Sequence, residues 1–522
     1  MRLLESTTLT FKEWADELLI PSYAILSHTW ADDEVSYQDM QQNRARAESK
    51  TGFQKLVYVS IQAQKDGLGY FWIDTCCIDK SSSAELSEAV NSMFRWYESA
   101  HTCYTFLSDV EARQKPDDHE PDQAWVTTFS NSRWFTRGWT LQELIAPRNL
   151  IFYSSQWSRV GTKQDLAPYI AQSTGIPINT LVHGHLSGVS VAQKMSWVSG
   201  RSTTRREDLA YCLIGIFEVN MPMLYGEGGR AFVRLQEEII KTTDDMSIFS
   251  WVDPQGSFGS YRGLLASSPS FFARCKHVSW TRNERTAEFS VTNKGIKLVL
   301  QLSPRTVQPN EFVAVLYGVA NTTMPNGVIG LYVHKIGDNQ YARVQPDQLA
   351  LLPVMPPVTS TSLFVRQKIV MESPEHSRAA AIVVKMPSDF MGIVDVKPAS
   401  RWNPSDQRFS LAPGQVSAIG SFSFCSFAND KNIINVIIDT SRVWGSILEI
   451  GHDWERIQHI NPFTHRIQCR KRGQTTIEIT IERGLVGDES LIYLSLVLLQ
   501  REGFSRRADF FKETLTNRGS TW

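Results

Sequence analysis

The pattern of hydrophobic and polar positions divides the 522-residue chain into three parts. In the first part, short apolar runs alternate with amphipathic stretches, which is typical of strands that alternate with helices. The apolar runs predict strands at 23–27, 70–74, 101–107 and 149–153. The stretches between them predict helices at 53–66, after Ser82, and at about 137–146, before Pro147. This alternation predicts an α/β fold, a parallel sheet with helices on both faces.

Local signals support the second helix and the break after the third strand. Ser82 and Glu85 have the spacing of a capping box, in which each side chain bonds the backbone of the other residue. The apolar face of this helix consists of Leu86, Val90, Met93 and Tyr97. Residues 111–123 are polar and contain proline, so they predict a loop.

The other two parts differ from the first in their periodicity. Residues 163–245 are mostly amphipathic at helical spacing, and a helix at 231–240 follows the Gly-rich turn 225–229. Its apolar face contains Phe232, Leu235 and Ile239. Beyond about residue 258, apolar and polar residues alternate as in half-buried strands. Such strands are predicted at 312–317, 328–333, 380–384, 433–438 and around 477–481.

We therefore predict three domains. Residues 1–160 form the α/β domain, 161–255 a helical segment, and 256–522 an all-β domain with a sandwich or barrel architecture.

Composition and charge narrow the class of protein. The 53 basic and 54 acidic side chains leave a net charge of −1, so no overall field attracts nucleic acid or anionic membranes. The N-terminus lacks the apolar run of a signal peptide, and the most apolar stretch, 491–499, is too short to span a bilayer. Seven scattered cysteines do not form a disulfide framework. We expect a cytoplasmic protein with no membrane span and no nucleic-acid partner.

Candidate chemistry lies where the predicted parallel strands end. Ligands bind beyond the carboxyl ends of such strands, which selects 27–30, 74–79 and 108–109. In the helix at 137–146, the helical period places Leu141, Leu144 and Ile145 on one face. Trp139 and Glu143 fall on roughly the opposite face, so we expect Glu143 outside the core. The alternative is that Glu143 is a solvated carboxylate and Trp139 packs against another domain.

Long sequence blocks in this region carry a family resemblance. The segments 23–30 (YAILSHTW), 72–79 (WIDTCCID) and 137–144 (RGWTLQEL) closely resemble the signature blocks of fungal heterokaryon-incompatibility (HET) domains, in the same order. A fourth block, 195–227, resembles the segment that follows the HET domain in many such proteins. The chain is thereby identified as similar to HET proteins.

HET domains are in turn similar to TIR domains, and this more distant likeness implies a flavodoxin-like fold and an activity. Some TIR domains cleave NAD at a glutamate in a Trp-Cys-x-x-Glu pattern, which resembles 139–143 with Thr140 in place of the cysteine. The resemblance implies that Glu143 is catalytic and that NAD is a substrate rather than a cofactor. Further nucleotide-binding residues would be Ser27, His28, Trp30, Asp74, Asp79, Arg137 and Trp139.

Other interpretations of these residues stay open. His28 could be a structural histidine, and Asp74 a helix cap or turn residue. Cys76 and Cys77 favour small core residues, although His28 could serve as the base for a cysteine nucleophile. Residues 203–208 predict a helix start, with Thr204 and Glu207 as a capping box.

The Gly-rich turn 225–229 lacks a P-loop lysine, which favours a plain turn. The pair His183 and His185 and the loose set His452, His459 and His465 lack partners at ligand spacing, so no metal is assigned.

Two functions follow as expectations from the resemblance. In the first, the chain is an incompatibility effector and NAD glycohydrolase that triggers programmed cell death after non-self recognition, a form of fungal innate immunity. Self-association would complete its site, and the C-terminal region would sense an unknown protein or ligand. In the alternative, the HET domain is a non-catalytic signalling or assembly module that acts through its surface.

Overall fold

A computed structural model describes most of the chain as two compact units, each considered by itself. The first unit comprises 1–252, 265–286 and 317–328, and the second comprises the rest. The described residues are 1–112, 122–255, 261–282, 288–305, 311–323, 327–337, 339–352, 360–367, 381–385, 391–397, 399–410, 419–426, 433–439, 446–450, 454–461, 465–471, 475–486 and 489–501.

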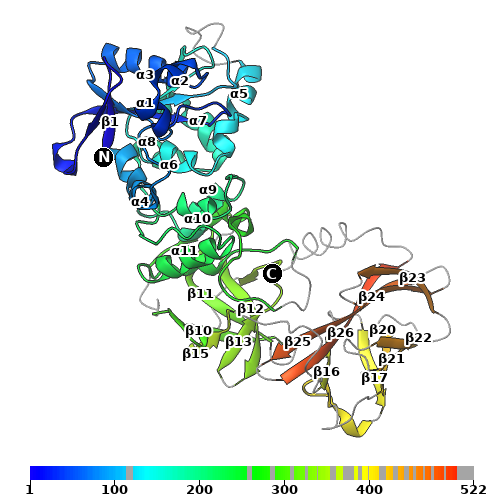
Figure 1. Ribbon diagram of the computed structural model, residues 1–522. Coiled ribbons are helices and arrows are strands. Elements are labelled where there is room, and N and C mark those ends of the chain that lie inside the picture. Colours follow the sequence, from blue (N-terminus) through cyan, green and yellow to red (C-terminus); the bar gives the residue numbers. More distant parts are fainter. Residues whose placement is uncertain are drawn as a thin grey trace. The chain divides into compact units, whose positions relative to one another are not determined.

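A twisted sheet with four central parallel strands forms the centre of the N-terminal region (Figure 1). These strands are β3 (Tyr23–His28), β4 (Tyr70–Trp72), β5 (Thr102–Phe106) and β6 (Leu150–Tyr153). Their spatial order β4-β3-β5-β6 is 2-1-3-4 in chain order, as in flavodoxin-like doubly wound sheets. The predicted α/β parallel sheet is confirmed, whereas the closer likeness to TIR domains stays a prediction.

Three antiparallel strands extend the sheet at its edges, and the sequence pattern did not predict them. The strands are β1 (Arg2–Glu5) and β2 (Phe11–Glu13) beside β4, and β7 (Arg159–Thr162) beside β6. They contain three or four residues each, and alternation over so few positions does not distinguish a strand from a loop.

Helices on both faces connect the parallel strands. Between β3 and β4 lie α1 (Tyr37–Gln42), α2 (Arg44–Ser49) and α3 (Phe53–Lys65); α4 (Ser83–Ser99) leads to β5, and α5 (Gln123–Ser130), η2 (Arg133–Thr136) and α6 (Thr140–Ile145) lead to β6. The chain moves in opposite directions from β3 to β4 and from β4 to β5. Right-handed crossovers therefore place α3 on one face and α4 and α6 on the other. Accordingly, α3 packs against β3 and β4, while α6 packs against β3 and α4.

The N-terminus of α4 agrees only in part with the sequence prediction. Ser82 caps α4 by accepting a hydrogen bond from the backbone N–H of Glu85, at 3.3 Å. The carboxylate of Glu85 bonds Arg2 and the N–H of Asp79 instead of completing the capping box. Leu86 is only half-buried, whereas the rest of the predicted apolar face is buried. Most of the predicted loop 111–123 lies outside the described residues.

A helical region follows in the same compact unit. Its helices are α7 (Lys163–Thr174), α8 (Ile178–His183), α9 (Val191–Val198), α10 (Asp208–Tyr211) and α11 (Arg230–Ile240), followed by the short turns η3 (Met246–Phe249), η4 (Pro269–Phe272) and η5 (Cys275–His277) and by strand β8 (Val278–Trp280). The predicted helix after the Gly-rich turn is confirmed as α11, and Phe232, Leu235 and Ile239 are buried.

The second unit is rich in β-structure, as predicted. Its first strands are β9 (Ser290–Thr292), β10 (Gly295–Pro304), β11 (Glu311–Asn321), β12 (Val328–Gly337), β13 (Gln340–Arg343), β14 (Ala350–Leu352) and β15 (Ser360–Val365). Residues 317–321 of β11 and Val328 of β12 are counted with the first unit. The pairings run β12-β13-β15-β10-β11, and β11 also pairs with β12. These pairings close the sheet on itself, so this part of the chain is barrel-like.

The remaining strands form two further sheets. One has the order β18-β19-β16-β26-β25-β24-β23 and the other β17-β20-β21-β22. Their bounds are β16 (Ala381–Lys385), β17 (Met391–Lys397), β18 (Trp402–Asn403), β19 (Arg408–Ser410), β20 (Ile419–Ser426), β21 (Ile433–Asp439), β22 (Ser446–Ile450), β23 (Trp454–Asn461), β24 (His465–Lys471), β25 (Thr475–Val486) and β26 (Glu489–Arg501), with η6 (Ala399–Arg401) before β18. All five predicted strands correspond to observed ones.

Candidate functional site

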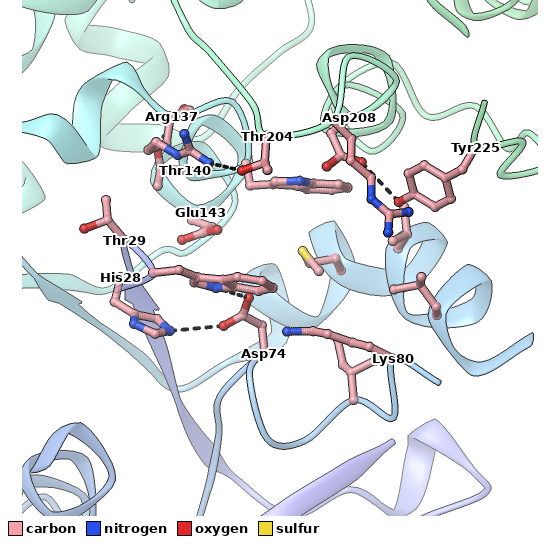
Figure 2. Close-up of a pocket in the computed structure, with 17 residues that line it drawn as sticks. His28, Thr29, Asp74, Lys80, Arg137, Thr140, Glu143, Thr204, Asp208 and Tyr225 are labelled. Atoms are coloured by element: carbon pink, nitrogen blue, oxygen red, sulfur yellow. Dashed lines mark hydrogen bonds and ion pairs between the residues drawn. The ribbon is translucent and has the colours of Figure 1, made fainter. Parts of the chain in front are cut away.

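A pocket of about 310 Å³ opens at the carboxyl ends of the parallel strands (Figure 2). The end of β3, the turn after β4, and helices α4 and α6 form one part of its lining, and residues 204–225 form the other. Its polar and aromatic lining residues are His28, Thr29, Trp30, Asp74, Lys80, Arg137, Trp139, Thr140, Glu143, Thr204, Arg205, Asp208 and Tyr225. A volume of this size lies at the lower end of the range for small-molecule sites.

Glu143 lies on α6 with only 7% of its surface exposed, and it lines the pocket. The hydroxyl of Ser27 donates a 2.5 Å hydrogen bond to its carboxylate, and the indole N–H of Trp134 donates to the same hydroxyl at 2.8 Å. Burial and the nearby charge of Asp74 raise the pKa of Glu143 to about 8, against the opposing effects of Ser27, Arg201 and Tyr97. A pKa of about 8 favours the protonated carboxyl group near pH 7.

The expectation that Glu143 lies outside the core is wrong. All six residues of α6 are buried, because the side of the helix away from the sheet is covered as well. The guanidinium of Arg201 lies there and donates to the carbonyl of Arg137 at 2.8 Å and to the hydroxyl of Thr140 at 3.0 Å. Helical spacing shows which residues share a face, but it does not show what covers the opposite face.

Asp74, after β4, joins His28 and Trp30 at the next strand end. Its carboxylate accepts hydrogen bonds from His28 Nε2 at 3.1 Å and from the indole N–H of Trp30 at 2.8 Å. The ammonium of Lys55 lies 3.0 Å from His28 Nδ1 and can only donate, so Nε2 carries the proton shared with Asp74. Burial acts to raise the pKa of Asp74, but His28, Lys80 and Trp30 outweigh it, and the pKa is lowered.

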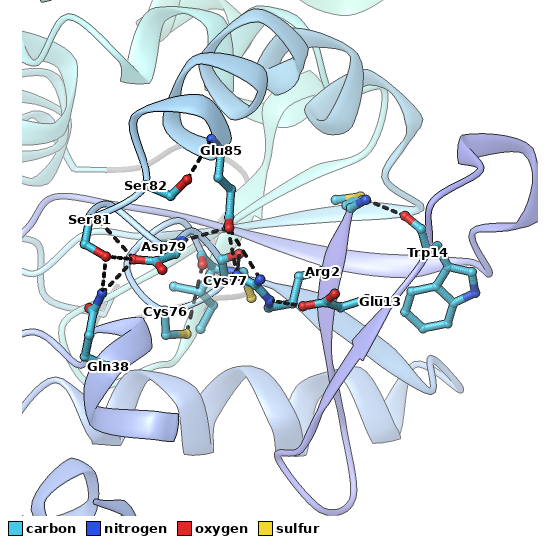
Figure 3. A network of polar contacts seen from close by, with 12 residues as sticks. Arg2, Glu13, Trp14, Gln38, Cys76, Cys77, Asp79, Ser81, Ser82 and Glu85 are labelled. Carbon is cyan, nitrogen blue, oxygen red and sulfur yellow. Dashed lines mark hydrogen bonds and ion pairs between the residues drawn. The ribbon is translucent and has the colours of Figure 1, made fainter. Parts of the chain in front are cut away.

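Asp79 lies in a different network, so its assignment to the nucleotide site is not supported by its position (Figure 3). Its carboxylate accepts hydrogen bonds from the side chain of Gln38 at 2.6 Å and from the backbone and hydroxyl of Ser81 at 2.9 and 2.6 Å. Its own N–H donates to Glu85, which also binds Arg2 at 2.7 Å. Asp79 thus orders the turn before α4, and Glu85 links that turn to Arg2 in β1.

Arg137 and Trp139 line the pocket just before α6. Arg137 donates a 3.1 Å hydrogen bond to the hydroxyl of Thr204. Trp139 is half-buried, and it opposes the rise in the pKa of Asp208, of which burial is the largest cause. Both residues therefore connect the α/β part of the pocket to residues after position 200. For Trp139 this position agrees with the alternative that it packs against another domain, whereas the bond from Arg137 to Thr204 was not predicted.

Lys80, Arg205, Asp208 and Tyr225 are pocket residues that the sequence patterns missed. Residues 203–208 were predicted to form a capping box, and this is wrong: α10 begins at Asp208, and no side chain caps it. The carboxylate of Glu207 instead accepts hydrogen bonds from the N–H groups of Gly226 and Gly228, at 2.8 and 3.0 Å. The Gly-rich turn thus binds an internal carboxylate, a contact distant in sequence that local spacing does not reveal.

Cys76 and Cys77 are buried, in agreement with the core interpretation, and neither lines the pocket. The neighbouring Cys77 and burial both raise the pKa of the Cys76 thiol. The thiol of Cys76 therefore stays protonated and non-nucleophilic. In the described part of the chain, no group of three or more His, Cys, Asp or Glu side chains could hold a metal ion. Across the same residues, no helix is long and apolar enough to cross a membrane.

The region that contains the doubly wound sheet is similar to HET-domain proteins. Residues 23–124 match the family described as Heterokaryon incompatibility protein (HET). Glu143 and residues 204–225 lie beyond this match.

Among characterised proteins, the chain is similar to the vegetative incompatibility protein HET-E-1 of Podospora anserina. The two are 48% identical over 239 residues, which is 45% of this chain and 17% of that protein. No solved structure matches the chain.

Proposed function

We propose that the chain acts in heterokaryon incompatibility and that its pocket binds a nicotinamide nucleotide and cleaves the nicotinamide–ribose bond at Glu143. The single observation that carries this proposal is the position of Glu143, a buried carboxyl group of raised pKa that lines the strand-end pocket. Strongly perturbed carboxyl groups in clefts mark functional sites more often than chance. The family match and the incompatibility relative support the biological role.

The chemistry requires little of the protein besides charge and position. Nicotinamide leaves a cationic substrate as a neutral base, so no general acid is needed, and the ribose passes through an oxocarbenium-like state. A water molecule then bonds to the anomeric carbon and gives up a proton to solvent, which leaves ADP-ribose. A carboxylate at Glu143 would stabilise the developing positive charge. The bound pyridinium cation favours ionisation of Glu143, because an opposite charge nearby lowers a carboxyl pKa.

Neighbouring residues have complementary roles in this proposal. Ser27 holds the carboxyl of Glu143 through a hydroxyl that Trp134 also binds. Asp74, oriented by His28 and Trp30, offers carboxylate oxygens to ribose hydroxyls. Trp30 is 48% exposed, and its ring offers a surface on which a base or the pyridinium can stack.

The burial of Glu143 also supports a second candidate function, that of a non-catalytic module. The carboxyl of Glu143 is hydrogen-bonded inside the protein, so it could serve only to join β3 to α6 in a non-catalytic module that signals through self-association. In that case the pocket would be a structural feature and the surface of the domain would carry the function.

The deciding experiment measures nicotinamide release from NAD by the purified full chain, with its oligomeric state followed by light scattering. Glu143→Gln keeps the size of the side chain and removes the carboxylate. Glu98→Gln, on the exposed side of α4, is the matched control. We expect loss of at least about a hundredfold in turnover for Glu143→Gln, typical for removal of an electrostatic stabiliser, and no change for the control.

Expression of the same variants in fungal cells distinguishes the two candidates. The catalytic proposal predicts that Glu143→Gln no longer kills cells although it folds and accumulates. Absence of NAD turnover by an oligomeric wild type, together with full killing by Glu143→Gln, would establish the non-catalytic module instead.

A further inference from the structure

Residues after position 200 form a second wall of the pocket. Thr204, Arg205, Asp208 and Tyr225 all line it, and they come from the helical region rather than from the α/β sheet. Figure 2 shows Asp208 and Tyr225 on one side of the pocket, with His28 and Thr29 on the other. A ligand that fills the pocket would therefore touch both regions of the chain.

Three cationic side chains line this pocket, namely Lys80, Arg137 and Arg205. Within the part of the chain that the structure describes, none of the three forms an ion pair with a carboxylate. The pocket carboxylates Asp74 and Asp208 interact with Lys80 and Arg205 at longer range, but without a direct ion pair the N–H groups of these cations can still bind an anionic ligand.

Neutral groups hold these cations in place. The Lys80 ammonium lies 3.5 Å from the centre of the Trp30 ring, and the Arg205 guanidinium lies 4.3 Å from the centre of the Tyr225 ring. The Tyr225 hydroxyl is itself fixed by a 3.1 Å hydrogen bond to Asp208. Stacking on an aromatic ring orients a guanidinium and leaves its N–H donors available at the edge.

We propose that Arg205, assisted by Arg137 and Lys80, binds the phosphate groups of a nucleotide whose ribose lies at Glu143. The planar guanidinium offers paired N–H donors that match the oxygens of a phosphate. This assignment rests on the proposed function for the location of the ribose, and it adds the phosphate wall. The site is then complete only when the helical region is docked on the α/β region, so the first 160 residues by themselves do not provide it.

The test uses the full chain and isothermal titration calorimetry with four probes. ADP-ribose and nicotinamide mononucleotide contain phosphate, and nicotinamide riboside does not. Inorganic phosphate is the phosphate group without a nucleoside. Arg205→Gln is compared with Arg206→Gln, because Arg206 is adjacent, exposed and outside the pocket. Thermal unfolding of both variants verifies that they fold as the wild type does.

We expect Arg205→Gln to weaken binding of ADP-ribose and nicotinamide mononucleotide by about tenfold or more, as for a lost hydrogen bond to a charged group. Binding of nicotinamide riboside should be unchanged in both variants, and Arg206→Gln should bind all probes as the wild type does.

Several results would overturn the inference. One is that Arg205→Gln and Arg206→Gln weaken ADP-ribose binding equally, and another is that Arg205→Gln weakens nicotinamide riboside binding as much as ADP-ribose binding. The inference also fails if inorganic phosphate binds as tightly as ADP-ribose, or if the wild type binds neither ADP-ribose nor nicotinamide mononucleotide. These outcomes are separable from the failure of the proposed function. A chain that binds ADP-ribose through Arg205 but never releases nicotinamide would refute cleavage and retain the phosphate wall.

Discussion

The raised pKa of Glu143 predicts a specific pH dependence of stability. Glu143→Gln replaces a titrating carboxyl group with a neutral amide of nearly the same size, in a position where Ser27 can still donate its hydrogen bond. The wild type and the variant should therefore differ in how their free energies of unfolding change with pH, more than in their values at low pH.

The magnitude follows from the two pKa values. The ordinary pKa of the group is 4.5 and its pKa in the folded chain is about 8, with burial as the largest cause. Between these pH values the unfolded chain loses the proton while the folded chain retains it, so stability is lost as pH rises. Each full pH unit between the two pKa values costs about 1.36 kcal/mol, and partial ionisation at both ends of the range leaves a loss of about 3.5 kcal/mol between pH 5 and pH 8.

The assay is urea unfolding of wild type, Glu143→Gln and the exposed control Glu98→Gln across this pH range. Subtraction of the variant from the wild type cancels titration of all other groups, including Lys163, whose pKa burial lowers to about 8. We expect wild type and control to lose stability with rising pH relative to Glu143→Gln. Parallel curves for all three proteins would show that Glu143 is ionised in the folded chain throughout, and would refute the assigned pKa.

Further predictions concern how α6 is held and how it acts. Lys163→Met should lower the free energy of unfolding by about 2–4 kcal/mol in urea melts, because the buried ammonium donates to the carbonyls at the end of α6, including that of Pro147 at 2.5 Å; a loss below about 0.5 kcal/mol would contradict it. Gly138→Ala should cost about 1–3 kcal/mol, since its Cβ would lie 2.5 Å from Cγ2 of Thr203, and Thr203→Ser should recover most of the loss in a double-mutant cycle; additive effects would argue against this clash. If Glu143 acts as a carboxylate, kcat/KM for NAD should rise with pH up to about 8, and a flat profile would contradict that role.

Sequence periodicity was sufficient for the elements whose burial pattern is strong. The strand at 23–28 is buried at every position, and α3, α4 and α11 have continuous apolar faces, so local composition identifies each of them. The parallel arrangement follows from their alternation. The short strands β1, β2 and β7 lack such a signal, because they are stabilised by pairing with an existing sheet edge rather than by their own pattern.

The candidate site shows a similar division. The strand-end rule and the sequence blocks placed Ser27, His28, Asp74 and Glu143 at one edge of the sheet, and the structure brings these four side chains into contact with one another or with the same pocket. The same rule also selected Asp79. Asp79 follows Asp74 by only a few residues, but its carboxylate bonds Gln38 and Ser81 in a separate network.

What the sequence by itself determined is the α/β alternation, the order of the strand ends and the presence of a glutamate at residue 143. Only the tertiary structure decided that Glu143 is buried, since the covering Arg201 lies 58 positions further along the chain and helical spacing carries no information about it. Docking of residues 202–225 onto α6 likewise created the wall with Arg205 and Tyr225. Burial and convergence of charge depend on which segments meet in space, and these two properties set the chemistry of the pocket.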